Sequence, residues 1–240
     1  MFQNKILRRL PDEEKERLLE VSEHVCFSRR QVLHHFKLPI EFLYFIESGA
    51  VSAAAKVADE TFVEVWLIGC EGLVGAPMTL SVERHAFHRC MVRVAGEAWR
   101  IRFDDLIVSL EEMPTLRALV HHYIATVLVQ CSQSGACNST HELDHRLARW
   151  LSLARLALRS DDIPLTHDDL AQILGCRRAG ITECIKSLRQ SDLISTARGL
   201  IRILDSDTLA ASSCECLRLI NREGALAQLH VGQDSAAGTI

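Results

Sequence analysis

A short stretch in the C-terminal half of the chain places guanidinium, hydroxyl, carboxylate and ammonium groups at helical spacing. The stretch follows Gly175 and begins with two adjacent arginines. Its outward-facing residues are expected to be Arg178, Thr182 and Lys186, at steps of four, flanked by Arg177, Ala179 and Glu183. A guanidinium donates two parallel hydrogen bonds to O6 and N7 of guanine, and a carboxylate accepts one from N4 of cytosine. This residue set therefore predicts contacts to the edges of base pairs.

Two short amphipathic helices joined by a tight turn must carry these groups. Thr166 and Asp169 form a capping-box arrangement and predict that the first helix begins there. Gly175 supplies the backbone conformation that ends this helix. The buried residues are expected to be Leu170, Ala171, Ile173 and Leu174 on the first helix and Ile181, Cys184, Ile185 and Leu188 on the second. Such a pair predicts a helix-turn-helix, whose second helix enters the major groove of DNA.

The segment LISTARGLIRIL, which follows the second helix, alternates around Arg198 and Gly199. It predicts a small hairpin, or wing, that brings Arg198 to the sugar-phosphate backbone, where a contact positions the protein without reading sequence. Lys186 and Thr166 are expected to contact the backbone as well. The predicted DNA-binding residues are Thr166, Arg177, Arg178, Ala179, Thr182, Glu183, Lys186 and Arg198. The alternative is a solvated helix face on which Glu183 pairs with Lys186.

The N-terminal half is expected to form short strands over about residues 24–101. The segment AVSAAAKVADETFVEVWLIG alternates like a hairpin with its turn at Asp59 and Glu60, and RCMVRVAGEAWRI repeats the pattern with Gly96 at the bend. Many short strands separated by glycines predict a barrel or a jelly roll. The preceding helix, LPDEEKERLLEV, is expected to turn Leu18, Leu19 and Val21 inward.

From Phe103 the hydrophobic period becomes helical, and Pro114 is placed to open a long helix that runs to about Gly135. Its apolar stripe recurs in steps of three and four, which suits a two-stranded seam with a second copy of the chain. The predicted dimerisation residues are Leu116, Leu119, Tyr123, Val127 and Gln130 or Cys131. The alternative is that this stripe packs on the chain's own strands. A further helix is expected at about residues 139–157.

The composition limits the kinds of function. The chain has 240 residues, of which 48% are hydrophobic, and this is enough for two cores. Its formal net charge of −4 excludes a uniformly basic surface, so contacts to DNA must come from a local cluster of arginine and lysine. Nine cysteines without the rhythm of a disulfide framework predict a reducing cytoplasm, and neither an export signal nor a membrane span is expected.

Four segments make the sequence resemble the Crp/Fnr family of bacterial transcription regulators over nearly the whole chain. They are YFIESGAVS, CNSTHELDHRLARWL, LTHDDLAQILGCRRAGITECIKSLRQSDLI and the wing RGLIRILD. The resemblance implies an α+β fold with an N-terminal double-stranded, jelly-roll-like β-roll sensor domain, a long dimerisation helix and a C-terminal winged helix-turn-helix. The expected domains are residues 1–112, 113–137 and 138–222, followed by a tail, 223–240, that is expected to be disordered.

The function that follows is a sequence-specific transcription regulator that binds a pseudo-palindromic site as a homodimer and responds to a signal at the β-roll. Its expected partners are double-stranded DNA, a second copy and, for an activator, RNA polymerase. No enzymatic activity is expected. Two alternatives are a cupin-like metal enzyme and a protein-interaction module whose C-terminal domain does not bind DNA. Against the first, His85 and His88 are expected on opposite faces of a strand.

The departures from the family pattern concern the DNA word and the signal. Arg178 matches the family's first recognition arginine, but Ala179 replaces the glutamate that usually follows and Glu183 replaces the later arginine. The DNA word is therefore expected to differ from the family's best-known one. In members that bind cyclic AMP, a glycine-glutamate pair and an arginine-serine pair hold the phosphate. Here the matching positions are Gly75-Ala76 and His88, Arg89 and Cys90, so a cyclic nucleotide is not expected.

The sequence predicts no metal and no other cofactor. The N-terminal part has only Cys26 before Cys70, whereas an iron–sulfur cluster needs closely placed thiolates. Cys214 and Cys216 are two residues apart and are expected to diverge on a helix, and the eleven histidines show no zinc-type spacing. Cys131 and Cys137 lie at the end of the long helix, where they are either a thiol switch or small buried apolar residues.

Overall fold

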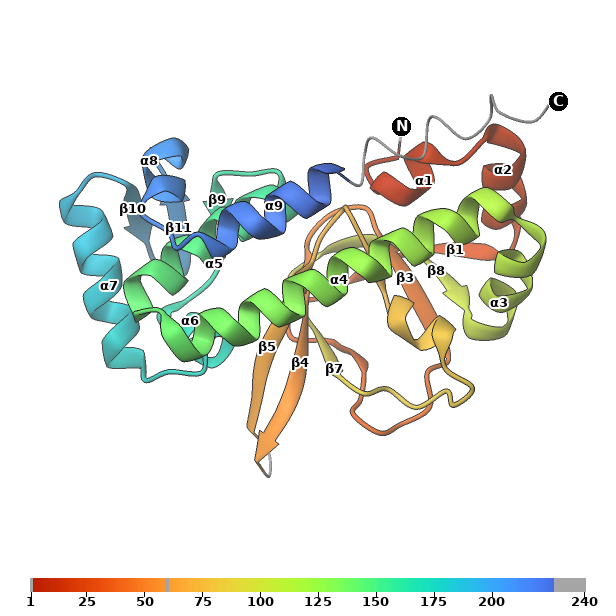
Figure 1. Ribbon diagram of the computed structural model, residues 1–240, viewed down its shortest axis with the longest axis horizontal. Helices are drawn as coiled ribbons and strands as arrows, with labels where there is room; N and C mark the ends of the chain where they lie inside the picture. The colour runs from red at the N-terminus through yellow and green to blue at the C-terminus, as the bar shows by residue number, and fades with distance from the viewer. Residues whose placement is uncertain (1, 59–60, 227–240) are drawn as a thin grey trace, which may run out of the picture.

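The computed structural model describes residues 2–58 and 61–226, which form an N-terminal β-roll, a long helix and a C-terminal domain (Figure 1). Two four-stranded antiparallel sheets, in the orders β1-β8-β3-β6 and β2-β7-β4-β5, enclose one hydrophobic core. The strands are β1 (Ser22–Phe27), β2 (Val32–His34), β3 (Phe42–Ile46), β4 (Ala50–Ala58), β5 (Thr61–Ile68), β6 (Leu73–Val74), β7 (Arg89–Val94) and β8 (Gly96–Arg102). The predicted jelly-roll-like domain is confirmed.

The predicted hairpin is present as β4 and β5, which pair Val51 with Ile68 and Ala53 with Trp66. These four side chains are buried because alternate residues of each strand face the core. The predicted turn residues 59–60 lie outside the described part of the chain. The hairpin is long, and its outer face is available to other elements.

The expectation that β7 and β8 repeat this hairpin is wrong, because they lie in different sheets. The bend at Gly96 is the point at which the chain crosses from one sheet to the other. A Cβ atom on Gly96 would lie 2.1 Å from the carbonyl oxygen of Ser48, so this close backbone approach requires glycine.

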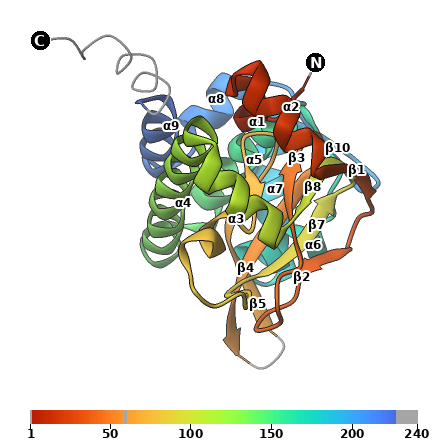
Figure 2. The same ribbon diagram turned by 90° about the vertical axis from the view of Figure 1, so that its right-hand side faces the viewer.

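Two short helices, α1 (Lys5–Arg9) and α2 (Asp12–Glu20), cover one end of the β-roll (Figure 2). The first was not predicted. It is capped by the buried Asn4, whose side chain accepts from the amides of Ile6 and Leu7. In α2, Leu18 is fully buried and Leu19 half-buried, as expected, but Val21 is exposed because it lies at the cap after the helix has ended.

The helices α3 (Phe103–Glu112) and α4 (Pro114–Thr140) connect the domains, and α4 runs five residues past the predicted end at Gly135. The stripe predicted as the dimer seam faces the chain's own β-roll. Its residues pack against the β-roll core, and only Cys131 is partly exposed. They are Leu116, Leu119, Tyr123, Val127 and Cys131. The alternative of packing on the chain's own strands describes this face of α4.

The C-terminal domain has its own core and combines helices with a small sheet. Its elements are α5 (Leu143–Leu158), β9 (Asp162–Ile163), α6 (His167–Leu174), α7 (Arg178–Gln190), β10 (Ile194–Ala197), β11 (Leu200–Ile203), α8 (Ser206–Ala211) and α9 (Cys216–Leu226). The sheet order is β10-β11-β9, so the predicted wing has a third strand. Helix α5 begins at Leu143 rather than near Ser139 because α4 continues to Thr140.

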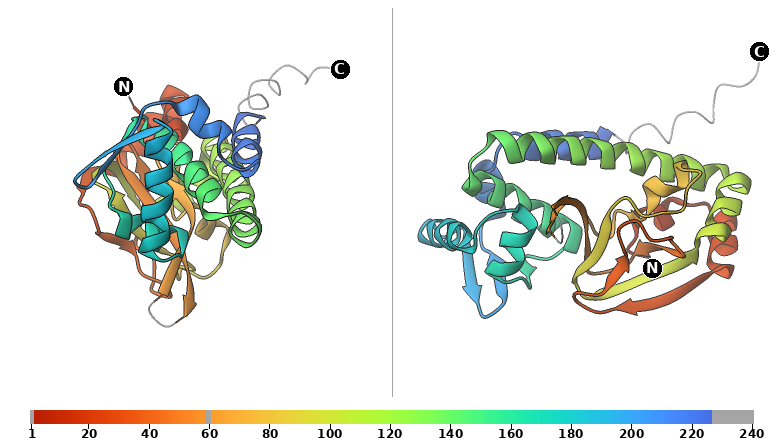
Figure 3. Two further views of the ribbon diagram at one scale, coloured as in Figure 1. Left: turned by 90° about the vertical axis from the view of Figure 1, so that its left-hand side faces the viewer. Right: turned by 90° about the horizontal axis from the view of Figure 1, so that it is seen from below.

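Helix α9 returns from the C-terminal domain and lies alongside α4 (Figure 3). Residues 223–226 of the expected disordered tail are therefore helical, and residues 227–240 lie outside the described residues. Among the residues that the structure describes, no helix is long and apolar enough to span a membrane.

The two domains are in direct contact through α5, α6 and the β4–β5 hairpin. Trp150 Nε1 donates to Glu64 Oε1 at 2.6 Å, and Arg93 Nη1 donates to Gln172 Oε1 at 2.9 Å. Glu64 is buried, and burial raises the pKa of its carboxyl, although Arg93 acts in the opposite direction. The β-roll therefore contacts α5 through a buried hydrogen bond and α6, the first helix of the helix-turn-helix, through a partly buried one.

Candidate nucleic-acid interface

The start of α6 has the predicted capping box. Thr166 Oγ1 accepts from the amide of Asp169 at 3.2 Å, and Asp169 Oδ2 accepts from the amide of Thr166 at 2.8 Å. The four residues expected to be buried on this helix, Leu170, Ala171, Ile173 and Leu174, are all buried. This cap fixes the first residue of α6, and the buried face fixes its rotation against the domain core.

Gly175 ends α6 in the left-handed conformation, with φ of +62°. A Cβ atom there would lie 3.1 Å from a methyl group of Val63 on β5, so the turn packs closely against the β-roll. Beyond the turn, α7 begins at Arg178 with Arg177 at its N-cap. It buries Ile181, Ile185 and Leu188, as the sequence predicts.

The outer face of α7 is open to solvent and contains the predicted residues. Arg177, Arg178, Ala179, Thr182, Glu183 and Lys186 are all exposed. Figure 1 shows α7 at the end of the molecule opposite α1 and α2. In the described residues the side chain of the N-cap residue Arg177 does not bond to the first amides of α7. The N-terminus of a helix has unpaired N–H groups and a positive dipole end that favour phosphate. The face therefore combines donors for bases with donors for the backbone.

Two of these side chains make local contacts that the sequence did not predict. Arg178 Nη1 lies 3.2 Å from Asp168 Oδ2, with both side chains about two-thirds exposed. A pair this exposed contributes at most about 1 kcal/mol, so the guanidinium is free to exchange it for a base. The hydroxyl of Thr182 lies 3.1 Å from His167 Nδ1 and donates to the carbonyl oxygen of Arg178. These contacts hold both side chains against the start of α6.

The predicted wing is formed by β10 and β11, with Gly199 at φ of +72° in the turn. Arg198 is exposed at its tip. At the other end, Arg202 on β11 makes a two-bond ion pair with Asp162 of β9. This pair was not foreseen, because a two-residue strand leaves no periodic signal. It fixes the base of the wing and leaves Arg198 free.

The exposed face of α4 shows a second regular spacing. Ala118, His121, Ala125, Leu128, Ser132, Gly135 and Ser139 are exposed and follow one another in steps of three and four. Leu128 is 67% exposed, and no atom of residues 2–58 or 61–226 lies within 4 Å of the position of a Cβ atom on Gly135, apart from its own helix turn. Steps of three and four are the spacing of a coiled-coil seam, and small residues allow two backbones to approach closely.

The positions that match the family's cyclic-nucleotide residues are engaged in packing. Ala76 and Cys90 are buried. His88 stacks edge-on against Trp66, with 4.8 Å between ring centroids, and the guanidinium of Arg89 lies over Phe62. His85 and His88 precede β7 in a connecting segment rather than within a strand, and in the described residues neither belongs to a group with metal-ligand geometry.

The expected divergence of Cys214 and Cys216 is wrong. Cys214 precedes α9 and Cys216 is its first residue, so the two thiols do not follow helical geometry. They meet Cys137 and His141 at the end of α4, and the four potential ligand atoms all lie within 4.8 Å of one another. The thiol of Cys137 is fully buried here, and Cys131 packs elsewhere, against the β-roll core.

Comparison with known proteins supports this architecture. A family model described as the Crp-like helix-turn-helix domain matches residues 145–212, which include α6, α7 and the wing. No curated protein matches the sequence.

Solved structures of bacterial regulators have the same fold. FixK2 from Bradyrhizobium japonicum has a TM-score of 0.68 at 12% identity, covering 81% of this chain and 98% of that one. The c-di-GMP responsive global regulator CLP of Xanthomonas campestris has a TM-score of 0.64 at 16% identity, covering 81% and 100%. A transcriptional regulator of the CRP/FNR family from Thermus thermophilus, TTHA1359, has a TM-score of 0.61 at 20% identity, covering 80% and 98%. These likenesses extend over both domains and the helix between them.

Proposed function

We propose that this DNA-binding transcription regulator of the Crp/Fnr type acts in the cytoplasm as a homodimer. Its binding site would be a pseudo-palindromic operator. Each copy would place α7 in one major groove, and the two grooves would face the same side of the duplex. For an activator, the further partner would be RNA polymerase.

The observation that carries the proposal is the open outer face of α7 behind the Gly175 turn. Arg178 and Glu183 are the proposed base readers, and Arg177 and Thr182 contribute at the edge of the groove. Lys186, Thr166 and Arg198 are the proposed backbone contacts. Ala179 would bring only a methyl group to the groove. The carboxylate of Glu183 accepts hydrogen bonds and does not donate them. The preferred DNA sequence should therefore contain cytosine where an arginine would select guanine.

The proposed dimer seam is the exposed face of α4 that contains Ala125, Leu128 and Ser132. It replaces the buried stripe, whose side chains are already occupied by the β-roll. A parallel pair of α4 helices related by a twofold axis would place the two C-terminal domains side by side at one end of the seam.

Regulation is proposed to act through the contact between the β-roll and α6. A signal at the β-roll must favour one arrangement of the domains over another to change DNA binding. The domains would be coupled by the buried bond from Trp150 to Glu64 and by the partly buried bond from Arg93 to Gln172.

Selection of bound fragments from random duplex DNA tests the proposal. We expect enrichment of an inverted repeat whose half-sites lie about 34–36 Å apart, one helical turn. Failure of the folded dimer to enrich any sequence would instead favour a C-terminal domain that only contacts other proteins. An asymmetric single site would contradict the homodimer.

A further inference from the structure

We infer that Cys137, His141, Cys214 and Cys216 form a binding site for a zinc ion that joins the end of α4 to the start of α9. The proposed DNA contacts use none of these four residues. The zinc site therefore stands whether or not the proposed operator contacts are right.

The donor set is that of a structural zinc site. Zinc in such sites is held by four cysteine or histidine ligands in a tetrahedron, and three cysteines with one histidine are one of the usual sets. With zinc–sulfur bonds of about 2.3 Å, tetrahedral geometry separates two sulfurs by about 3.8 Å. Here the sulfurs of Cys137 and Cys214 are 3.4 Å apart, and Cys216 Sγ lies 3.7 Å from His141 Nδ1. All four ligand atoms fall within 4.8 Å of one another, so small adjustments suffice.

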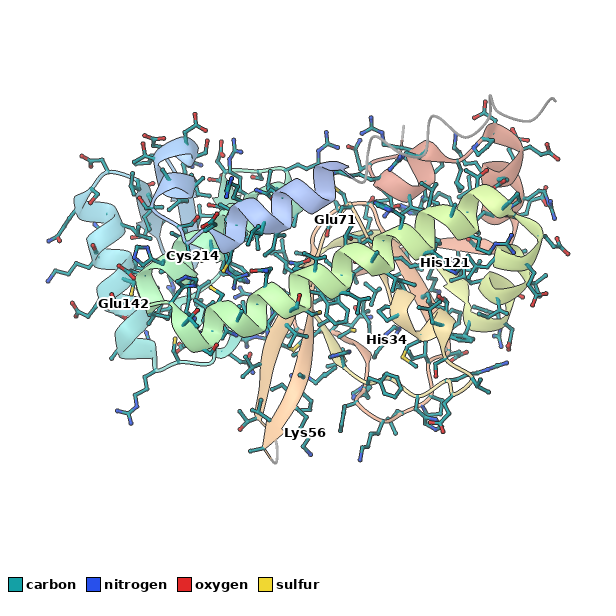
Figure 4. The ribbon with its side chains drawn as sticks, viewed as in Figure 1. His34, Lys56, Glu71, His121, Glu142 and Cys214 are labelled. Carbon is teal, nitrogen blue, oxygen red and sulfur yellow. The ribbon has the colours of Figure 1, made fainter. Side chains whose placement is uncertain are left out.

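The local structure explains why the four side chains converge. Cys137 and His141 are four residues apart at the end of α4 and therefore lie on the same side of the helix. Cys214 lies in the connection between α8 and α9, and Cys216 begins α9. Figure 4 labels Cys214 between the start of α9 and the C-terminal end of α4. The three cysteines form a buried cluster separate from the cores of the two domains.

A buried arginine supplies the charge that such a complex needs. Zinc with three thiolates and a neutral imidazole has a net charge of −1, and binding releases three thiol protons to solvent. Arg149 is 3% exposed, its Nη1 donates to Ser134 Oγ at 3.3 Å, and its Nε has no acceptor among the described residues. The Arg149 guanidinium interacts electrostatically with the thiols of Cys137 and Cys216. Arg149 makes no salt bridge among the described residues, although the buried carboxylate of Glu64 interacts with it electrostatically, and a buried cation stabilises a further anion placed beside it.

A disulfide is the competing chemistry, and the geometry favours metal. A disulfide between Cys137 and Cys214 would use two of the four donors. It would not explain why the Cys216 thiol and the imidazole of His141 also lie beside them. Four converging donors of two chemical kinds match metal binding instead. Because all four positions would be filled by the protein, the site is structural rather than catalytic.

The position of the site gives it a mechanical role. The chain leaves α4 at His141, builds the whole winged helix-turn-helix in residues 142–213, and returns at Cys214. Zinc would therefore connect the two chain ends of the DNA-binding domain and hold α9 against α4. The closed loop limits the freedom of the unfolded chain, as a cross-link does.

The test uses the full chain, produced without a polyhistidine tag in medium supplemented with zinc. We expect about one zinc per chain by elemental analysis. Cobalt(II) added to the metal-free protein should give the strong visible bands of a tetrahedral thiolate complex. Chelation should lower the melting temperature of the parent by several degrees. It should leave a Cys214→Ser variant unchanged, because that variant has no metal to lose.

Two further variants keep the test decisive if a buried substitution impairs folding. His141→Gln changes a half-exposed ligand and should reduce zinc well below one per chain. Cys184→Ser, in the same domain but outside the cluster, should keep full zinc content. A folded, DNA-binding parent without zinc or cobalt, iron in place of zinc, or a Cys137–Cys214 disulfide in alkylated protein would each overturn the inference. Zinc binding without DNA binding would overturn only the proposed function.

Discussion

Arg29 of the β-roll reaches into the helix-turn-helix, where its Nη2 lies 2.5 Å from Asp169 Oδ2 at the start of α6. The same carboxylate closes the capping box with Thr166. One side chain therefore both starts the first helix of the DNA-binding unit and contacts the sensor domain. Substitutions of Asp169 and of Arg29 can therefore distinguish the contribution of the helix cap from that of the contact between the domains.

Replacing Asp169 should cost more than replacing its partner. Asp169→Ala removes the Asp169 half of the capping box and the ion pair, and should lower the free energy of unfolding by about 1–2 kcal/mol. Arg29→Ala should cost less than about 1 kcal/mol, because its side chain is 36% exposed and solvent screens the pair. Urea unfolding of both variants and of the double variant measures this. Equal losses in the two single variants would show that the ion pair, not the cap, is the main contribution.

His34 should make the protein less stable at mildly acidic pH. It is buried, and its Nε2 donates to the carbonyl oxygen of Phe42 at 2.7 Å. Burial lowers its pKa from 6.5 to about 4. The folded state therefore resists a proton that the unfolded state accepts below about 6.5. The stability is fully present above that pH, and on the order of 3 kcal/mol is lost as the pH falls to about 4.

Unfolding measured between about pH 7 and pH 4.5, which spans most of that window, tests this expectation. A His34→Gln variant should show a smaller decline with falling pH than the parent, whatever its stability at neutral pH. His85→Gln, at an exposed histidine, should decline as the parent does. An unchanged slope in His34→Gln would show that other groups govern the acid response.

A charge on the exposed face of α4 should separate the dimer. Leu128→Glu would place a carboxylate opposite its own copy on the seam and should give a folded monomer in sedimentation equilibrium. Its stability should change by less than about 0.5 kcal/mol, as for most surface substitutions. Val108→Glu, on α3, changes a similarly exposed apolar residue and should leave the dimer intact. A dimer that persists in Leu128→Glu would place the seam elsewhere.

The buried face of the same helix should respond differently. Leu116 is fully buried against the β-roll, so Leu116→Ala should lower the free energy of unfolding by about 2–5 kcal/mol. The variant should remain dimeric while it is folded. Dissociation of folded Leu116→Ala into monomers would instead support the seam first expected from the sequence.

The helix-turn-helix, formed by α6, α7 and the turn between them, was predictable because its sequence signals are local. Thr166 with Asp169 marks the first residue of a helix, and Gly175 marks its end, a short distance further along the chain. The exposed spacing of Arg178, Thr182 and Lys186 follows directly from the helical period once those limits are known. No contact with a distant segment is needed to place these side chains.

The features that were missed depend on partners distant in sequence. The periodicity of α4 reveals an apolar stripe, but it does not say whether the β-roll or a second chain covers it, and the exposed small residues give little hydrophobic signal. The pairing of β7 and β8 in different sheets is equally non-local. Cys137 and Cys214 meet only because α9 folds back along α4. The two-residue spacing of Cys214 and Cys216 was misleading because the helix begins only at Cys216.

Base reading by Arg178, on which the proposed function depends, is tested most directly by a ratio of two affinities. Binding of the selected duplex and of a random duplex should be measured at one salt concentration for the parent, Arg178→Ala and Arg198→Ala. Arg178→Ala should reduce the ratio by about 5- to 150-fold, the equivalent of about 1–3 kcal/mol. Arg198→Ala should weaken both affinities alike and leave the ratio unchanged. If the ratio in Arg178→Ala equals that of the parent, Arg178 does not read bases and the proposed function is contradicted.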